Sequence, residues 1–241
     1  MVVARSRFDE AVAAPESAHD SISHVGFVRR TLDVGLSALG LMLFSPLLVV
    51  IAILVSLTSR GGPLFRQTRV GEGWREFTMF KFRSMRRGRA GSDLTVRDDD
   101  RVTRLGRILR LTGMDELPQL WNVLRGDMTL VGPRPETVGL ALRYPPECRG
   151  IFQYRPGVTG PTQLANWNHD DYGDALSAEQ RYLEVRVPGR VTLDMNYLVD
   201  PSLKRTLGVL ARTAFLALTS VGKAFGAKRT RRVRRRGVRK T

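Results

Sequence analysis

The pattern of apolar positions changes sharply near the start of the chain. From Val34 to Ser59, 26 consecutive residues carry no charged side chain, and no other stretch of the sequence resembles this run. About 20 apolar residues are enough to cross the hydrocarbon core of a bilayer. The run therefore predicts a membrane-embedded helix, and a buried helix of a soluble domain is the alternative.

Two details of this run argue against a simple crossing. Ser45 and Pro46 lie in its middle, and proline kinks or breaks a helix because it lacks an N–H group and clashes with the preceding turn. Basic residues flank both ends, at Arg30 and Arg60, and such residues favour the cytoplasmic side. We therefore predict a re-entrant helix-break-helix over residues 25–60, with a kinked transmembrane helix as the alternative.

The rest of the chain mixes short strand-like and helix-like patterns. β-branched and aromatic residues gather in the expected strands, and apolar residues recur every three to four positions in the expected helices. The fold class predicted is α+β and mostly helical, with a compact membrane-associated domain over residues 61–222. Strands are expected at 63–65 and 77–82, helices at 104–111, 117–124, 140–149, 179–187, 193–198 and 204–221, and a turn-rich loop at 154–160.

The two ends of the chain differ from its middle in composition. Residues 1–24 have no sustained apolar period, so we expect a flexible leader, and the apolar run begins too late for a signal peptide. Residues 223–241 hold ten Lys and Arg and no acid, which predicts a basic disordered tail. The formal charge of +16 falls to +6 without this tail. Such a charge suggests a polyanionic partner, namely nucleic acid, an anionic membrane or phosphorylated substrates.

Several chemical classes lose their usual support. The lone Cys148 excludes a disulfide framework, and with three histidines it cannot form an ordinary structural zinc site. The sequence contains no GxxxxGK[ST], HExxH or GxSxG motif, and no GxGxxG follows a predicted strand. Because His19 and His24 lie in the leader, we do not expect a histidine base.

Two adjacent carboxylates, Asp115 and Glu116, stand out just before Pro118 and an amphipathic stretch. One interpretation is structural, because acids in the first turn of a helix cap free N–H groups. The other is catalytic: a helix N-terminus also binds anions, and a carboxylate beside a phosphate and a divalent metal can attack phosphorus. The residues alone leave both interpretations open.

Basic residues around this pair have the character of phosphate ligands. Arg134 stands between two prolines, which fix its backbone, and its planar guanidinium matches a phosphate group. Lys81, Arg83 and Arg110 add positive charge in nearby motifs. Each alone is typical of a solvated surface charge, so the inference depends on the group.

From Arg30 to about Tyr197 the sequence resembles the bacterial sugar transferase family, the monotopic phosphoglycosyl transferases. The resemblance implies transfer of a sugar-1-phosphate from a UDP-sugar to polyprenyl (undecaprenyl) phosphate with release of UMP. This is the initiating step of exopolysaccharide, capsule, O-antigen or glycoprotein glycan assembly. The matching strings are RTLDVGLSALGLMLFSPLLVV, GGPLFRQTRVGEGWREFTMFKFRSM, DDDRVTRLGRILRLTGMDELPQLWNVLRGDMTLVGPRPE and RPGVTGPTQLA.

The resemblance also implies roles for individual residues. Asp115 falls on the nucleophile that forms an aspartyl-phosphosugar, and Glu116 on the position associated with Mg²⁺, with Asp115 as a further candidate ligand. Ser45 and Pro46 fall on the break of the re-entrant helix. The substrate- and phosphate-binding positions fall on Lys81, Arg83, Ser84, Arg110, Pro133, Arg134, Pro135, Arg155 and Asp194.

The implied setting is the bacterial cytoplasmic (inner) membrane, with the active site on the cytoplasmic face and anionic lipids, not nucleic acid, as partners. A single apolar run precedes the motifs, so the chain resembles the minimal form of the family. Departures from the family pattern lie at residues 161–164, 166–174 and 193–202, so the sugar is not identified, nor is the oligomeric state. The alternatives are a catalytically silent scaffold of the same fold and a basic nucleic-acid-binding membrane protein.

Overall fold

A computed structural model describes residues 23–59, 61–86, 99–165, 179–199 and 201–237. Helices dominate and the strands are short, which confirms the mostly helical α+β class. The predicted leader and the divergent segment 166–174 lie almost entirely outside the described residues.

The elements fall into four strands, seven α-helices and four short turns of other helix types within these described ranges. The strands are β1 (Leu64–Val70), β2 (Glu76–Phe82), β3 (Thr129–Val131) and β4 (Gly157–Thr159). The α-helices are α2 (Ser23–Thr58), α3 (Arg104–Thr112), α4 (Gln119–Arg125), α5 (Val138–Ala141), α6 (Pro161–Ala165), α8 (Val187–Leu198) and α9 (Leu203–Gly237). The short turns are η1 (Glu72–Trp74), η2 (Met114–Glu116), η3 (Pro146–Gln153) and η4 (Tyr182–Arg186), the last a π-helical turn.

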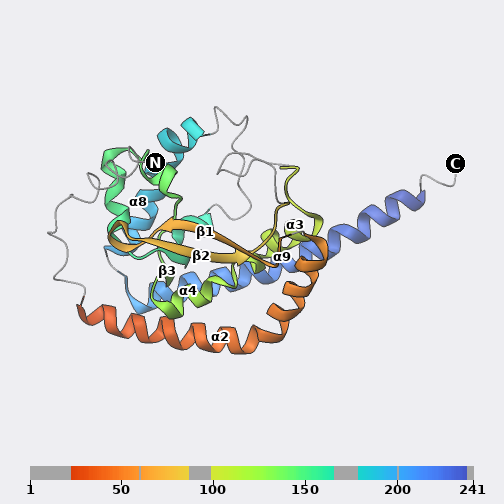
Figure 1. Ribbon diagram of the computed structural model, residues 1–241, viewed down its shortest axis with the longest axis horizontal. Coiled ribbons are helices and arrows are strands. Elements are labelled where there is room, and N and C mark those ends of the chain that lie inside the picture. Colours follow the sequence, from red (N-terminus) through yellow and green to blue (C-terminus); the bar gives the residue numbers. More distant parts are fainter. Residues whose placement is uncertain (1–22, 60, 87–98, 166–178, 200, 238–241) are drawn as a thin grey trace.

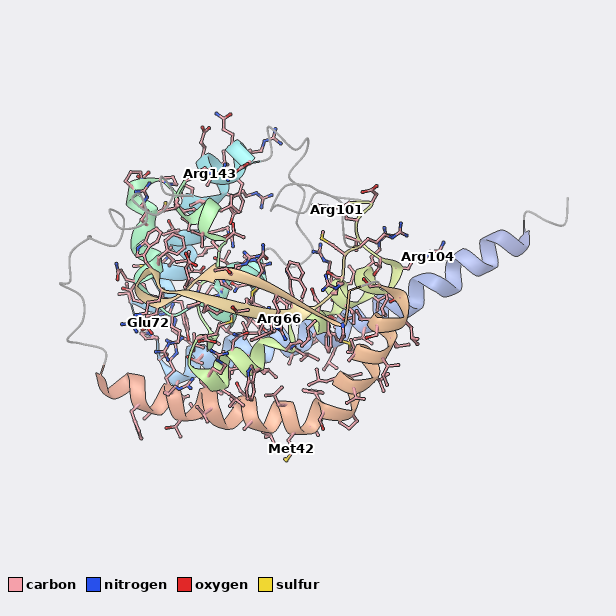
Figure 2. The ribbon with its side chains drawn as sticks, in the orientation of Figure 1. Met42, Arg66, Glu72, Arg101, Arg104 and Arg143 are labelled. Carbon is pink, nitrogen blue, oxygen red and sulfur yellow. The ribbon has the colours of Figure 1, made fainter. Side chains whose placement is uncertain are left out.

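Helix α2 is bent but not interrupted. It contains Pro46, and Figure 1 shows it turning sharply along its length; Figure 2 places Met42 on the first arm, before the turn. Proline cannot donate to the carbonyl four residues earlier, which is that of Met42. The Ser45 hydroxyl donates to this carbonyl instead, at 2.8 Å. The Ser-Pro pair thus bends the helix while its freed acceptor stays hydrogen-bonded.

One face of α2 packs on the domain and the other is open. Among the described residues, α2 is the one helix long and apolar enough to cross a membrane, over Gly26–Thr58. Only 11% of its most apolar 18-residue stretch is buried in the structure. Outward-facing Met42 and Leu57 are exposed, whereas Ile51 and Val55 are buried. The exposed apolar face is therefore the side available to lipid.

Polar side chains near the start of α2 hold it to the domain. Arg30 donates to the carbonyls of Val123 and Leu124 at the end of α4, at 2.6 and 2.9 Å. Buried Asp33 accepts from the Thr129 hydroxyl at 2.6 Å and from the Leu130 N–H at 3.0 Å. These bonds connect the apolar helix directly to strand β3.

The first two strands form an antiparallel hairpin whose register pairs Leu64 with Phe82 and Val70 with Glu76. We expected β1 to end at residue 65, and it continues five residues further because pairing with β2 stabilises a polar segment that has no clear strand pattern. At its turn, Trp74 takes a φ of 63°, a conformation that L residues rarely adopt. Burial of its ring against Phe152, with centroids 4.6 Å apart, maintains this conformation.

Strands β3 and β4 pair in parallel, and we predicted neither; β4 lies inside the segment expected to be a loop. Each strand has three residues, too few for a recognisable alternation. Their approach is close: a Cβ added to Gly157 would lie 2.1 Å from the backbone nitrogen of Gly132. The pair of glycines therefore permits contact between backbones that are distant in sequence.

The remaining helices mostly follow the sequence pattern. Helices α3, α4 and α9 lie within a few residues of their predicted starts. The single helix expected at 140–149 is wrong: α5 ends at Ala141, and a separate 3₁₀ segment, η3, begins at Pro146 directly after Pro145. The helices expected at 179–187 and 193–198 join into one run through η4.

Helix α9 runs from the domain to Gly237, and Figure 1 shows its C-terminal part projecting past the domain. The helix continues to residue 237, and the disordered basic tail expected at 223–241 stays a prediction. Within the domain α9 packs on α3. The predicted boundaries 25–60, 61–222 and 223–241 stay predictions.

Candidate active site

Local backbone features at the two ends of α3 determine where the two carboxylates lie. The Thr103 hydroxyl caps the start of α3 by accepting from the Gly106 N–H at 2.9 Å. Gly113 ends α3 with a φ of 69°, a left-handed conformation that suits glycine. The chain then turns through η2, which carries Asp115 and Glu116. Gly113 and Pro118, at the N-caps of η2 and α4, form no side-chain cap, and both carboxylates lie in the first turn of η2.

Asp115 is buried, with 6% of its surface exposed, and its carboxylate accepts no hydrogen bond from the residues that the structure describes. Burial, and to a lesser degree the charge of Glu116, raise its pKa to about 6, while Lys81, Arg110 and Arg134 act to lower it. The group is therefore ionised at neutral pH but poorly solvated, which favours nucleophilic attack.

Three cations, Lys81, Arg110 and Arg134, act electrostatically on this carboxylate. Burial and the charge of Arg69 lower the pKa of Lys81 to about 8, whereas Asp115 acts in the opposite direction. The Arg110 guanidinium donates to the Ser84 hydroxyl at 2.9 Å, which orients it at the end of α3. Mutual repulsion among these cations would decrease on binding a phosphate.

Arg134 connects the second carboxylate to the loop after β3. Its guanidinium lies 3.5 Å from Glu116, and both side chains are partly exposed. Arg69, which is buried, donates to the Pro135 carbonyl at 3.1 Å and so fixes the loop behind Arg134. The flanking prolines and Arg69 together pre-order the arginine.

Two pockets meet at Arg134. The first contains Glu116, three cations and two glutamines; it will be called the phosphate pocket. The second contains aromatic rings with charged groups near them; it will be called the aromatic pocket. The phosphate pocket is lined by Arg69, Met79, Lys81, Glu116, Gln119, Arg134, Pro135, Gly157, Val158 and Gln163. The aromatic pocket is lined by Val70, Pro133, Arg134, Tyr144, Ile151, Phe152, Tyr154, Pro156, Arg190, Val191 and Asp194.

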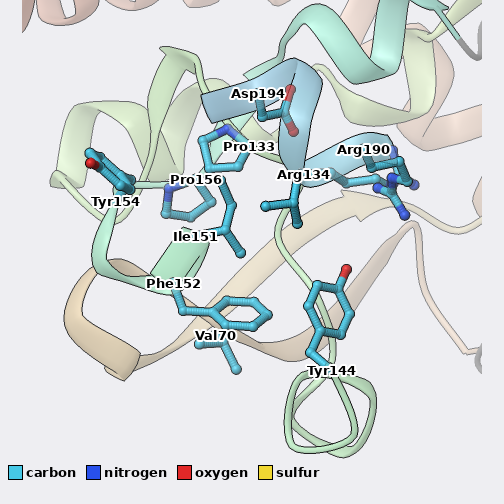
Figure 3. A pocket seen from close by; sticks show the side chains of 11 residues that line it. Val70, Pro133, Arg134, Tyr144, Ile151, Phe152, Tyr154, Pro156, Arg190 and Asp194 are labelled. Carbon is cyan, nitrogen blue, oxygen red and sulfur yellow. The ribbon is translucent and has the colours of Figure 1, made fainter. Parts of the chain in front are cut away.

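Figure 3 shows the rings of Phe152 and Tyr144 on one side of the aromatic pocket, with Asp194 and Pro133 on the other. Asp194 is buried and accepts from the Thr162 N–H at 3.1 Å. Burial raises the pKa of Asp194 to about 6, against the lowering effect of the hydrogen bonding from Thr162. The combination of flat apolar surfaces and polar groups suits a planar polar ring.

A buried polar cluster joins Tyr182 of η4 and Arg190 of α8 to Glu136, in the loop of Arg134, and to Tyr144. The Tyr182 hydroxyl donates to Glu136 and accepts from Arg190, which also donates to Glu136 at 3.2 Å. The Tyr144 and Tyr182 hydroxyls are 3.3 Å apart. Burial raises the pKa of both tyrosines, so both are neutral. We call Glu136, Tyr144, Tyr182 and Arg190 the Glu136 cluster.

Two predicted phosphate ligands have other partners here. The Arg83 guanidinium donates to the carbonyls of Gly61, Gly62 and Leu64, at 2.9 to 3.0 Å. Arg155 forms a two-pronged ion pair with Glu72, at 2.6 and 2.9 Å. Neither arginine lines either pocket. Substrate binding by these two residues stays a prediction.

Three polar residues of the phosphate pocket were not predicted as site residues: Arg69, Gln119 and Gln163. Arg69 lies in the matching string GGPLFRQTRVGEGWREFTMFKFRSM, where nothing in the residue pattern distinguishes it from the other basic residues. Gln119 lies in the same matching string as the two carboxylates. The structure shows in addition that its side chain is buried, with 2% of its surface exposed. Gln163 lies in the matching string RPGVTGPTQLA, at residues 161–164 that depart from the family pattern.

Few side chains near the site could bind Mg²⁺ directly. Across the described ranges, no cluster of three or more His, Cys, Asp or Glu residues suits a metal ion. The available carboxylates are those of Asp115 and Glu116. Mg²⁺ commonly binds to one or two carboxylates and completes its shell with water and substrate phosphates. The residues present are therefore compatible with a metal that arrives with a phosphorylated substrate.

An apolar helix fixed to a domain that holds a buried carboxylate among several cations is the arrangement expected of a membrane-associated transferase. Comparison with known proteins agrees: the model of the bacterial sugar transferase family matches residues 24–220. The chain belongs to this family, which confirms the resemblance found in its motifs, and it is a phosphoglycosyl transferase.

Curated relatives share most of the chain. A UDP-glucose:undecaprenyl-phosphate glucose-1-phosphate transferase of Caulobacter vibrioides is 42% identical over 197 residues, which are 80% of this chain and 70% of that protein. The exopolysaccharide production protein PSS of Rhizobium leguminosarum bv. phaseoli is 35% identical, over 82% of this chain and 98% of its own length. An Escherichia coli K12 relative named like the Caulobacter protein is 35% identical, and the match covers 39% of it.

Proposed function

We propose that this protein transfers a sugar-1-phosphate from a UDP-sugar to undecaprenyl phosphate through a covalent intermediate on Asp115. The observation that carries the proposal is the buried carboxylate of Asp115, without a hydrogen-bonding partner among the described residues and surrounded by Lys81, Arg110 and Arg134. The names of the relatives support the donor and acceptor classes. The product would begin the assembly of a polysaccharide or a related glycan.

The reaction has two balanced steps. A carboxylate oxygen of Asp115 attacks the phosphorus that bears the sugar, the P–O bond to the second phosphate breaks, and UMP leaves. A phosphate oxygen of undecaprenyl phosphate then attacks the same phosphorus, and the bond to Asp115 breaks. The product is an undecaprenyl diphosphate sugar, and the carboxylate is regenerated. A covalent route lets a soluble and a lipid substrate use one site in turn.

The cations act on the phosphate charge in both steps. Lys81, Arg110 and Arg134 contribute positive charge where charge develops on the non-bridging oxygens, an effect that is strong in a site shielded from water. Arg134 is held in place by the prolines and by the contact of Arg69 with Pro135, so it needs little reorganisation.

We propose that Mg²⁺ is the cofactor and that Glu116 holds it, with Asp115 as the second available carboxylate. When bound, the ion neutralises the diphosphate of the donor. Glu116→Gln should raise the Mg²⁺ concentration needed for half-maximal activity by at least about tenfold, as expected when an ionic ligand becomes neutral. An unchanged Mg²⁺ requirement would remove Glu116 from this role.

The proposal places the protein at the cytoplasmic face of the inner membrane, with α2 re-entrant. The bend at Pro46 and the exposed apolar face support this placement. The predicted interaction of the basic residues after 222 with anionic lipids belongs to the same proposal. Phe27→Cys and Pro63→Cys, each in a Cys148→Ala background, test the topology. Neither cysteine should react with a membrane-impermeant maleimide in intact cells, and reaction of either one excludes the re-entrant arrangement.

The reaction itself is tested with purified protein, undecaprenyl phosphate and a panel of UDP-sugars, with UMP as the readout. Incubation with the active UDP-sugar and no lipid should add the mass of one phosphosugar to the peptide that contains Asp115. Absence of UMP release with every donor would support the silent scaffold, and UMP release without the adduct would exclude the covalent route.

A further inference from the structure

The side-chain amide of Gln163 is buried without a partner. Neither its nitrogen nor its oxygen is exposed to solvent, and neither has a hydrogen bond within the described part of the chain. Gln163 lies on α6 and lines the phosphate pocket with Glu116, Lys81 and Arg134. Buried amides are normally hydrogen-bonded, so an unpaired one at a pocket wall indicates that a ligand completes the bonds.

The absence of a side chain at Gly160 leaves space for the Gln163 amide. A Cβ added at Gly160 would lie 2.9 Å from the Gln163 amide oxygen and 2.3 Å from the Gly132 carbonyl oxygen. Any side chain at position 160 would therefore displace the amide or separate α6 from the loop that carries Arg134. The position of Gln163 follows from the close packing of two motifs that are far apart in sequence.

The chemistry of the pocket restricts the ligand. Lys81, Arg69 and Arg134 require an anion with several acceptor oxygens, such as a phosphate. The Gln163 amide requires both an acceptor and a donor, and an ionised phosphate oxygen cannot donate. The ligand must therefore carry hydroxyl or N–H groups beside its phosphate. Undecaprenyl phosphate does not, because hydrocarbon follows its phosphate.

We propose that Gln163 binds a hydroxyl or N-acetyl group of the sugar in the donor's sugar-1-phosphate, and so contributes to sugar selection. This inference rests on the proposed function, in which Asp115 attacks the phosphorus that bears the sugar. The groups nearest that phosphorus belong to the sugar and not to the ribose or the base. Gln163 shares its pocket with Glu116, the neighbour of Asp115, and is therefore on the sugar side.

The test measures binding without turnover. Gln163→Met keeps the length of the side chain and removes both polar atoms. In an Asp115→Asn background, calorimetry gives the Kd for UDP and for whichever of UDP-glucose, UDP-galactose and UDP-N-acetylgalactosamine binds best. We expect Gln163→Met to weaken binding of the UDP-sugar about tenfold, as the loss of one or two hydrogen bonds would do, and to leave the Kd for UDP unchanged.

Turnover provides a second readout in the otherwise native protein. Gln163→Met should raise KM for the UDP-sugar and leave KM for undecaprenyl phosphate unchanged. The matched control is Gln180→Met, because the Gln180 amide is exposed and pairs with Glu184 at 2.9 Å; it should alter neither constant.

The outcomes separate this inference from the proposed function. A parallel loss of affinity for UDP would place Gln163 on the nucleotide, and a raised KM for undecaprenyl phosphate would place it on the acceptor; either result overturns the inference. Unchanged constants would show that a water molecule satisfies the amide, and would also overturn it. A failure of the wild-type protein to release UMP, with sugar-dependent binding still reduced by Gln163→Met, would refute the proposed function alone.

Discussion

The site of Asp115 and the Glu136 cluster are both buried and charged, yet their bonding differs. In the Glu136 cluster each charged or hydroxyl group meets a partner, as Arg190 and Tyr182 do with Glu136. The carboxylate of Asp115 has neighbouring charges but no hydrogen bond from the described residues. The segment from Arg134 to Glu136 connects the two regions, because Arg134 pairs with Glu116 and Glu136 belongs to the cluster. A cluster whose polar groups are all hydrogen-bonded stabilises the fold, whereas a buried carboxylate without a hydrogen bond can still interact with a ligand.

The largest expected effect is that of Asp115→Asn. UMP release should fall by several orders of magnitude, because asparagine preserves the size but not the attacking oxygen. The free energy of unfolding should stay equal or increase, because the substitution removes a buried charge that lacks a hydrogen bond. Activity is followed by UMP release and stability by urea denaturation. Normal turnover of this variant would refute the covalent assignment.

Glu136→Gln should show the opposite pattern. It leaves Arg190 buried without its counter-charge, which typically costs about 3 kcal/mol of stability. Turnover per folded molecule should change much less than in Asp115→Asn. The urea midpoint measures the loss, and Tyr182→Phe serves as a milder variant of the same cluster. A catalytic collapse without loss of stability would place Glu136 in the reaction.

Arg134→Ala and Arg155→Ala compare two arginines that flank the site. Arg134 lines both pockets, and its loss should lower kcat/KM about 100-fold, as for other groups that stabilise developing charge. The charge of Arg155 is neutralised by Glu72, so its loss should cost less than about fivefold. Equal losses would mean that Arg155 leaves Glu72 and binds substrate, as the family resemblance implies.

The smallest effect concerns pH. With pKa values of about 6 for Asp115 and about 8 for Lys81, kcat/KM should fall below the first value and above the second. Asp115 binds its proton more tightly in the folded protein than at its ordinary pKa of 3.8. Its ionisation therefore destabilises the fold above about pH 6, and this cost disappears as the pH falls toward 3.8. Urea denaturation across this range should show a weaker pH dependence for Asp115→Asn, and an identical dependence would exclude the raised pKa.

Several features were predictable from the sequence because they depend on neighbouring residues. The uncharged run and its Ser-Pro pair indicated a bent apolar helix, since proline removes a helix bond wherever it occurs. The sequence motifs predicted the family and six residues that line the two pockets, namely Lys81, Glu116, Pro133, Arg134, Pro135 and Asp194. Helices such as α3 have amphipathic patterns strong enough to be found locally.

Other features depended on contacts between segments far apart in the chain. Strands β3 and β4 are too short to show a pattern, and their pairing needs the close approach of Gly132 and Gly157. That pairing brings Gln163 beside Arg134 and Lys81 in one pocket.

The sequence alone determined which residues carry charge and where the helix bends. Only the tertiary structure decided that Arg83 binds backbone carbonyls and that Arg155 pairs with Glu72. It also decided that the carboxylate of Asp115 has no hydrogen bond among the described residues. The physical reason is that hydrogen bonding and desolvation depend on which distant groups surround a side chain, and residue type and spacing do not specify those groups.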